Sequence, residues 1–218
     1  MAPSGLNRVV IIPALNEESS IFSVVSNIVP YANVIVVDDG SIDRTAEFAE
    51  SAGGTIVSLE ENQGYDEALN RGFIKAAEMN FDYAVTFDGD GQLPINALIM
   101  ALEHLSTGKL DLVLGIRSEI ARPSEKLFNW YAKKKYGVPD ILCGLKGYSS
   151  SLYRDYGAFS YSRSIGTELS LYGLERNCSF EMVSLDVKRR VGPPRFGGII
   201  RANARIISAF ALHFCARS

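Results

Sequence analysis

The sequence predicts an α/β fold with one twisted, mainly parallel sheet flanked by helices. Short apolar or β-branched runs alternate with amphipathic segments through residues 8–115, which is the pattern of successive βαβ units. Hydrophobic residues make up 47% of the chain, so we expect a packed core. The 218 residues contain no linker-like segment or internal repeat, so we expect a single domain over 1–218.

The elements of the first half follow from runs and turn signals. The run at 8–12 predicts a buried strand ended by Pro13, and the β-branched run at 34–37 predicts a parallel strand buried on both faces. Asn16-Glu17-Glu18 has the polar cap and first-turn acids of a helix start, and Pro94 is expected to open another helix. Further strands are predicted at 55–59, 83–87 and 110–115, and helices at 19–29, 43–52 and 65–79.

The alternation fades after residue 120. Helices are predicted at 126–136, 168–176 and 199–214, and a strand at 180–187. The last helix is apolar but carries Arg201 and Arg205, so it could lie on an anionic membrane surface, or pack on the domain or a second subunit. No apolar run reaches the roughly 18 residues that a membrane span needs.

The expected functional edge of the sheet is set by its topology. Parallel α/β sheets bind ligands at the carboxyl ends of their strands, which lie just after Ile12, Val37, Phe87 and Gly115. Acidic residues follow three of these four positions. We therefore expect the chemistry there.

Charge and cysteine content exclude several classes of protein. The net charge of −3 gives no reason to expect a nucleic-acid binder, although residues 1–109 carry 5 Lys/Arg against 16 Asp/Glu and residues 110–218 carry 17 against 9. The three cysteines form no CxxC pair, which predicts neither a disulfide framework nor a zinc site.

The start of the chain lacks a signal-peptide pattern, so a cytoplasmic location is expected, with peripheral contact to the inner face of the membrane as an option.

Asp88-Gly89-Asp90-Gly91-Gln92 is the sharpest motif. Two carboxylates directly after a buried strand are costly unless a cation pairs with them, and a hard divalent ion with oxygen ligands fits. Such an ion would neutralise a diphosphate and help it leave. An ordinary acidic turn is the alternative.

Asp38-Asp39-Gly40-Ser41 ends a second strand. Carboxylates there can accept hydrogen bonds from a base or from ribose hydroxyls; a turn, with Asp43 capping the next helix, is the alternative. A receiver domain also places acids after strands, but its phosphoacceptor would stand alone rather than beside a separate D-x-D.

Other nucleotide and hydrolase classes lack their motifs. The chain has no G-x-G-x-x-G after the first strand and no G-x-x-x-x-G-K-[ST]. Only His104 and His213 could serve a Ser/His/Asp triad, and both are expected to be structural. A nucleotidyltransferase would need a Gly-rich loop with Arg and Lys after the first strand, where Pro13-Ala14-Leu15-Asn16-Glu17 stands instead.

Taken together, the motifs resemble the family 2 inverting glycosyltransferases, which have a GT-A fold. Four segments match in order: Pro13 to Glu17 resembles P-x-x-N-E, Asp38 to Thr45 resembles D-D-G-S-x-D-x-T, Asn62 to Gly72 resembles the N-x-G segment, and Asp88 to Pro94 resembles D-x-D-G-Q-x-P. The resemblance is strong over about 8–117 and weaker beyond. It implies a nucleotide-sugar-binding half over about 1–117 and an acceptor-binding half over about 118–218.

The resemblance also implies roles for single residues. Asp88, Asp90 and Gln92 would hold Mg²⁺ or Mn²⁺. Arg117 and Arg190 would contact phosphate, where a planar guanidinium suits bidentate contacts. Candidate catalytic side chains are Asp90, Glu168 and Asp140. The nucleotide-sugar pocket would comprise Pro13, Asn16, Glu17, Asp38, Asp39, Gly64, Arg71, Asp88, Gly89 and Arg117.

Later segments are most similar to the dolichol-phosphate mannose synthase branch, which charges polyprenyl phosphates. Gly115-Ile116-Arg117 resembles its G-x-R, Asp140 to Gly144 its D-x-x-x-G, Glu168-Leu169 its E-L helix, and Arg190-Val191-Gly192 its R-x-G. The chain departs from the branch after R-x-G, where Pro193-Pro194-Arg195 replaces the usual S-K.

A second departure bears on the acceptor. Members that glycosylate hydroxyls carry an E-D pair whose Asp is the base, but the comparable place here reads Gly166-Thr167-Glu168. A sugar hydroxyl needs a base, whereas a phosphate monoester is already anionic. We therefore expect transfer from a UDP- or GDP-linked sugar to a polyprenyl phosphate. A saccharide hydroxyl, with Glu168 or Asp140 as base, and an inactive nucleotide-sugar-binding scaffold are the alternatives.

Overall fold

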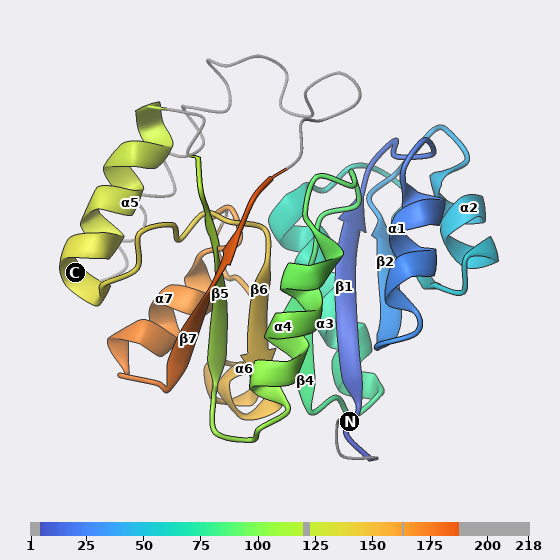
Figure 1. Cartoon of the computed structure of the whole chain (residues 1–218). Helices are drawn as coiled ribbons and strands as arrows, with labels where there is room; N and C mark the ends of the chain where they lie inside the picture. Colours follow the sequence, from blue (N-terminus) through green and yellow to red (C-terminus); the bar gives the residue numbers. More distant parts are fainter. Residues whose placement is uncertain (1–4, 120–122, 163, 188–218) are drawn as a thin grey trace.

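The computed structural model describes residues 5–119, 123–162 and 164–187. They form one seven-stranded sheet in the order β3-β2-β1-β4-β6-β5-β7 (Figure 1). Its strands are β1 (Arg8–Ala14), β2 (Asn33–Asp38), β3 (Thr55–Ser58), β4 (Tyr83–Thr86), β5 (Leu112–Arg117), β6 (Lys146–Ser149) and β7 (Phe180–Leu185). The predicted α/β fold with a mainly parallel sheet is confirmed, since only β6 runs antiparallel to its neighbours.

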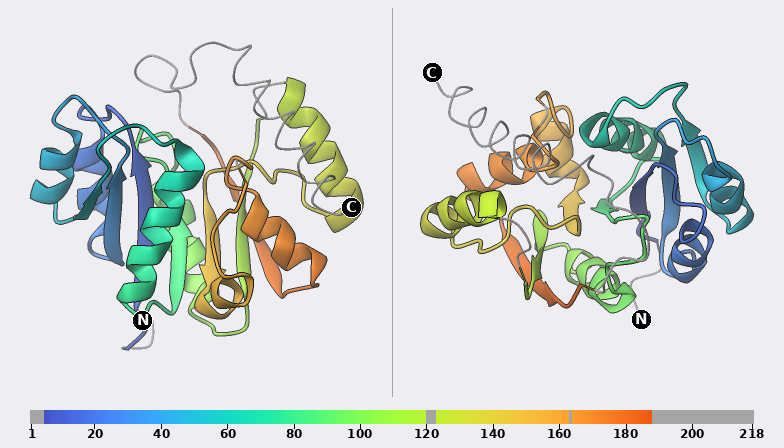
Figure 2. Two further views of the ribbon diagram at one scale, coloured as in Figure 1. Left: turned by 180° about the vertical axis from the view of Figure 1, so that it is seen from behind. Right: turned by 90° about the horizontal axis from the view of Figure 1, so that it is seen from above.

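Helices cover both faces of the sheet (Figure 2). They are α1 (Ile21–Ile28), α2 (Thr45–Ser51), α3 (Tyr65–Glu78), α4 (Ile95–Leu105), α5 (Pro123–Tyr136), α6 (Ser150–Tyr156) and α7 (Glu168–Glu175). One apolar layer packs α3, α5, α6 and α7 on the sheet, and the other packs α1, α2 and α4 on the opposite face. Among the described helices, none combines the length and apolar character needed to cross a membrane.

The centre of the sheet is β1, which pairs in parallel with β2 and β4. Its residues from Val9 to Ile12 are fully buried, as a strand covered on both faces requires. The predicted end at Pro13 was wrong, because the strand continues to Ala14. Pro13 is tolerated because the β4 pairing stops at Ile11, so the missing N–H removes no bond on that side.

The start of the first helix also differs from the prediction. Asn16, Glu17 and Glu18 lie in a loop with Asn16 at a positive φ of 53°, and α1 begins only at Ile21. The backbone amides of this loop donate to side chains 25–28 positions away, while the Glu17 carbonyl accepts from the Ser20 and Ile21 amides at the start of α1. Helices α2 and α4 begin at Thr45 and Ile95, with the Asp43 carboxylate accepting from the Thr45 amide and Pro94 just before α4.

Two elements were missed, namely β6 and α6. The four residues of β6 (Lys-Gly-Tyr-Ser) have no strand periodicity, yet they fill the gap between β4 and β5. This insertion carries residues 140–146 to the same edge of the sheet as the loop after β4. The predicted helix at 199–214 lies outside the described residues.

Candidate active site

The acidic loops predicted after the first, second and fourth strands lie together at the carboxyl edge of the sheet. Ala14 at the end of β1 pairs with Asp38 of β2, and its carbonyl accepts from the Asp39 amide at 2.9 Å. On the other side of β1, the Phe87 amide donates to the Ile11 carbonyl at 3.0 Å, which positions the loop that starts at Asp88. The prediction that parallel strands bring these motifs to one edge is confirmed.

Asp39 organises the first half of this edge. Its carboxylate accepts from the amides of Gln63 at 2.7 Å and Gly64 at 2.9 Å, so it holds the loop that leads into α3. Burial raises the pKa of Asp39, and the two amides oppose that rise. Gly40 has φ +76°, and a Cβ there would lie 2.8 Å from the Asn62 amide nitrogen, so a glycine is required beside this loop.

The loop after β1 is joined to the loop after β2. The backbone amide of Asn16 donates to Ser41 Oγ at 2.9 Å. The side-chain oxygen Oδ1 of Asn16 accepts from the Ile42 amide at 3.0 Å. The Glu17 amide donates to Thr45 Oγ1 at 2.8 Å. The two predicted nucleoside-binding segments therefore form one rigid unit, with Glu17, Asp38 and Asp39 almost completely buried.

The Asp88-Gly89-Asp90 loop is anchored to the same unit. Ser20 Oγ donates to the Gly89 carbonyl at 2.8 Å, and a Cβ on Gly89 would lie only 3.2 Å from Ile12 and 3.3 Å from Ile21. Within the loop, Asp90 Oδ1 accepts from the Gln92 amide at 3.1 Å. The backbone of the predicted metal motif is thus held in place by neighbours on β1 and α1.

Asp88 lies directly against Gly144, which precedes β6. A Cβ on Gly144 would sit 2.3 Å from Asp88 Oδ2, so only a glycine leaves room for this carboxylate. Thr86 Oγ1 donates to the Gly144 carbonyl at 2.7 Å and fixes the contact. Gly144, the last residue of the predicted D-x-x-x-G element, therefore lies beside the predicted metal loop. The spacing of the two motifs in the sequence did not indicate this contact.

The partly buried Arg117 and the buried Asp140 form an ion pair at the end of β5. Arg117 Nε and Nη2 donate to Asp140 at 2.7 and 2.9 Å, and Nη2 also reaches Glu125 of α5 at 3.1 Å. Burial alone would raise the pKa of Asp140, but the guanidinium outweighs it and holds that pKa below its usual value. Asn129 of α5 donates a further bond to Asp140 at 3.1 Å. Asp140 therefore orients Arg117, and its geometry gives no support to a role as base.

Glu168, the other candidate base, begins α7. Its carboxylate accepts from the Tyr156 hydroxyl, from the Tyr161 amide at 3.0 Å and from Ser162, whose amide lies at 2.9 Å. Burial would raise the pKa of Glu168, but these donors together hold it below the usual value. A carboxylate saturated by donors is a weak proton acceptor, so the geometry favours an anchoring role for Glu168.

Lys146 was missed by sequence reasoning. It lies on β6 opposite Thr86, is 3% exposed, and donates from Nζ to the Gly166 carbonyl at 2.5 Å. Burial lowers its pKa to about 8. The buried ammonium therefore joins β6 to the residue two positions before α7, a contact for which the sequence gave no signal beyond one lysine in a short segment.

Two further predicted residues lie differently from the rest. Gly64 is the residue before α3 and donates to Asp39, as described, whereas Arg71 projects from α3 and pairs with Glu67 at 2.8 Å while about half exposed. The neighbouring Asn70, in contrast, is bonded to the segment before α7: its Oδ1 accepts from the backbone amides of Phe159 and Ser160. The predicted nucleotide contact of Arg71 stays a prediction. Arg190 lies outside the described residues.

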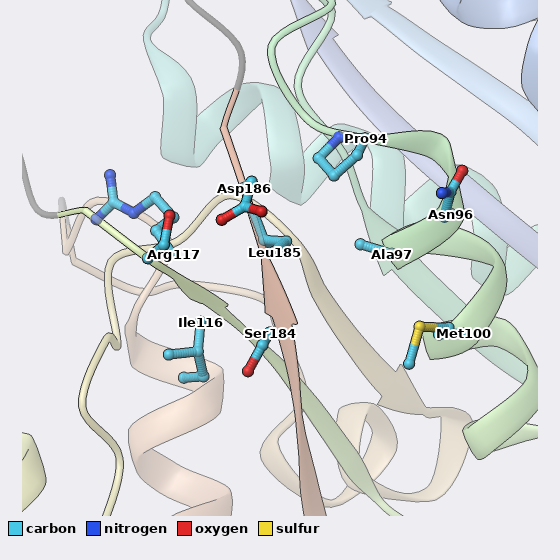
Figure 3. Close-up of a pocket in the computed structure, with 10 residues that line it drawn as sticks. Pro94, Asn96, Ala97, Met100, Ile116, Arg117, Ser184, Leu185 and Asp186 are labelled. Atoms are coloured by element: carbon cyan, nitrogen blue, oxygen red, sulfur yellow. The ribbon is translucent and has the colours of Figure 1, made fainter.

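A pocket of about 470 Å³ opens beside this edge (Figure 3). Its side chains come from α4 and from the ends of β5 and β7, and Arg117 forms part of its wall. The volume is in the range of sites that hold small ligands. The pocket is lined by Pro94, Asn96, Ala97, Met100, Ile116, Arg117, Ser118, Ser184, Leu185 and Asp186.

The model of the family described as "Glycosyl transferase family 2" matches residues 9–167. This chain belongs to that family. Every acid-bearing loop described above falls within the matched region. The chain is therefore a glycosyltransferase that uses a nucleotide sugar, as its motifs predict.

Relatives and solved structures agree with this assignment. The glycosyltransferase is 33% identical to protein RfbJ of Shigella flexneri over 116 residues, which is 52% of this chain and 87% of that protein. It is 32% identical to a UDP-N-acetylglucosamine–dolichyl-phosphate N-acetylglucosaminyltransferase of Methanococcus voltae, over 65% of this chain and 68% of that one. Glucosyl-3-phosphoglycerate synthase of Mycobacterium tuberculosis, solved with Mn²⁺ and UDP-glucose, superposes with a TM-score of 0.77 at 24% identity, over 96% of this chain and 78% of that one. The GT-A-like fold is thereby confirmed.

The residues at the edge fit a divalent metal. Within the described part of the chain, no three His, Cys, Asp or Glu side chains gather as a complete ligand set. Asp88 and Asp90 supply two carboxylates on an anchored loop, which suits Mg²⁺ or Mn²⁺ ions that take their other ligands from water and substrate phosphates. Solved structures of the synthase contain Mn²⁺ or Mg²⁺ together with UDP.

Proposed function

We propose that this glycosyltransferase moves a sugar from a UDP- or GDP-linked donor to a polyprenyl phosphate, with inversion at the anomeric carbon. The observation that carries the proposal is the arrangement at the carboxyl edge. There the anchored Asp88-Gly89-Asp90 loop lies beside the segment 140–146, whose Asp140 pairs with the partly buried Arg117 of β5. Donor and acceptor phosphates can thus be bound by adjoining parts of one edge.

The donor half of the proposal uses the rigid unit formed by the first two loops. Asp38 and Asp39, with Asn16 and Glu17, line the place where a base and ribose would lie, and their backbone is held by cross-loop hydrogen bonds. Carboxylates and amides there accept and donate bonds without reorganising when the nucleotide binds. The pocket acids accept from either a uracil or a guanine N–H, so the proposal leaves both nucleotides open.

The leaving diphosphate would be held at Asp88, Asp90 and Gln92 through Mg²⁺ or Mn²⁺. When bound, this ion neutralises the charge that develops on the diphosphate as the bond to the sugar breaks. The protein's contribution is to hold the loop, through Ser20 and Gly144, so that the two carboxylates keep their positions.

The acceptor half rests on Arg117. Asp140 and Glu125 hold its guanidinium at the end of β5 and keep it protonated. Residue Arg117 is also part of the wall of the 470 Å³ pocket. A phosphate monoester bound there carries its own negative charge and needs no general base, which agrees with the engaged states of Asp140 and Glu168. The dolichyl-phosphate relative supports this acceptor class. Arg190 is proposed as a second phosphate contact.

The decisive experiment is transfer from a panel of radiolabelled UDP- and GDP-sugars, with and without Mn²⁺, to a polyprenyl phosphate in detergent. We expect a lipid-linked product and free nucleoside diphosphate, both dependent on the metal. Transfer to saccharides but not to the lipid phosphate would replace the acceptor with a hydroxyl in polysaccharide synthesis. Nucleotide binding without any turnover would make the chain a scaffold. The folded protein binding no nucleotide would refute the donor site.

A further inference from the structure

Helix α5 carries an outward face that the proposed reaction does not use. Its buried positions are Glu125, Phe128, Asn129 and Ala132, while Lys126, Leu127, Trp130, Lys133 and Lys134 are exposed. These five exposed positions are related by intervals of three and four residues, so they form one stripe along the helix, whereas the exposed Lys135 lies outside it and bonds to Tyr131. The helix lies at the outer side of the molecule, at the end of the sheet opposite β3 (Figure 1).

The composition of this stripe is unusual for a solvent-facing helix. Trp130 is 59% exposed and Leu127 is 52% exposed, although burying such side chains is favourable. Three lysines flank them, and residues 126–135 contain no acid. Other exposed apolar side chains, such as Ile42, do not belong to a run of lysines on one helix face. Isolated apolar residues need no explanation, but an apolar stripe bordered by lysines does.

We propose that this lysine-tryptophan face of α5 binds the surface of an anionic lipid bilayer. Tryptophan and leucine suit the boundary between headgroups and acyl chains, and lysines are attracted to anionic headgroups. An acidic protein would account for the lysines but not for the adjoining Trp130 and Leu127. A nucleic acid is disfavoured by the net charge of −3.

The inner face of the same helix connects this surface to the reaction. Glu125 pairs with Arg117 at 3.1 Å, and Asn129 donates to Asp140 at 3.1 Å. A helix with its side chains is about 10–12 Å across, so the guanidinium would lie about that far from the bilayer surface. The inference deepens the proposed function, since a polyprenyl phosphate presents its phosphate at this surface.

Trp130 allows a direct test, because it is the only tryptophan in the chain. The full chain is mixed, without donor or acceptor, with vesicles of phosphatidylcholine alone or with added phosphatidylglycerol. We expect solvent-exposed emission in solution, a blue shift with the anionic vesicles only, and quenching by brominated lipids. Co-sedimentation with the same vesicles gives the affinity.

Two triple variants test whether vesicle binding depends on the lysines of this face or only on the overall charge of the protein. Changing Lys126, Lys133 and Lys134 to Gln should weaken vesicle binding about 100-fold, from about fivefold for each lysine. The matched variant changes Arg44, Lys109 and Arg154 to Gln. These exposed residues lie just before α2, just before β5 and on α6, all outside α5, so the loss of three charges there should leave the affinity within about twofold of the parent.

Several results would overturn the proposal. They are no binding to anionic vesicles, equal losses in the two triple variants, binding with unchanged Trp130 emission, and buried-type emission in the free protein. The last result would mean that protein already covers this face. Circular dichroism checks that each variant is folded. Transfer activity in detergent does not depend on a bilayer, so failure of vesicle binding and failure of the proposed reaction are separate outcomes.

Discussion

Gly144 is the position where a single methyl group should disable the metal loop without unfolding the protein. In Gly144→Ala the new Cβ would lie 2.3 Å from Asp88 Oδ2 and 2.7 Å from Asp88 Cγ, whereas ordinary contacts begin near 3.4 Å. The carboxylate must therefore move by about 1 Å, or β6 must move away from β4. Misplacement of a catalytic group by about 1 Å can cost about 100-fold in rate, and overpacking of this size costs about 1–3 kcal/mol of stability.

The assay is metal-dependent binding of nucleoside diphosphate by calorimetry, together with transfer kinetics and urea unfolding. We expect kcat/KM to fall by about 100-fold and Mn²⁺-dependent binding to weaken in parallel, while the protein stays folded. Gly147→Ala is the matched control. It lies on β6, three residues after Gly144, and its Cβ would meet Leu105 Cδ1 at 2.5 Å rather than Asp88, so it should cost stability but not metal binding. Unchanged binding in Gly144→Ala would refute the claim that Gly144 positions Asp88.

Three further predictions follow from the site. Asp90→Asn should abolish metal-dependent nucleotide binding and leave the urea midpoint unchanged; retained Mn²⁺ dependence would remove Asp90 from the metal site. Arg117→Met should destabilise the fold by about 3 kcal/mol, because it leaves a buried carboxylate unpaired, whereas Arg44→Met breaks only an exposed pair and should change little in the same urea titration. The pKa of Lys146 is lowered to about 8 in the folded state from 10.5, so the unfolded chain binds more protons between these values and stability should rise as pH increases from about 8 to about 10. Unfolding measured against pH should show this rise, of up to about 3 kcal/mol, reduced in Lys146→Met; equal slopes in both proteins would contradict it.

Most of the donor half was predictable because its signals are local. The runs that became β1, β2 and β4 are apolar through their length, and a strand buried on both faces needs that composition. Strand β2 ends at Asp38, Asp88 comes two residues after the end of β4, and parallel strands bring their carboxyl ends to one edge. Asp38, Asp39 and Asp88 could therefore be placed together from the order of elements alone.

The misjudged positions are those that depend on long-range partners. Asn16 and Glu17 have the residue types of a helix start, but Ser41 and Thr45 bind their amides and keep the segment in a loop. Strand β6 has too few apolar residues to be recognised, and its burial follows from two neighbouring strands that leave a gap between them.

The two candidate bases, Asp140 and Glu168, were also predicted from local signals in the sequence. Asp140 was identified as a lone acid in a motif, and only the fold shows that Arg117, 23 residues earlier, neutralises it. Glu168 was identified as the first residue of a helix, and the hydroxyls and amides of 156–162 fold back onto its carboxylate. In both cases the chemistry of a carboxylate is decided by donors that residue type and local spacing do not reveal.

By itself, the sequence determined the α/β class, the order of most strands and helices, and the identity of the acidic loops at the carboxyl edge. These features depend on hydrophobic periodicity and on turn residues, which act over a few neighbouring positions. Only the tertiary structure decided that Gly144 borders Asp88, that Lys146 is buried and bonded to the Gly166 carbonyl, and that one helix joins Arg117 to an exposed lysine-tryptophan face. These relations arise where the antiparallel β6 enters a parallel sheet and brings together side chains that are far apart along the chain.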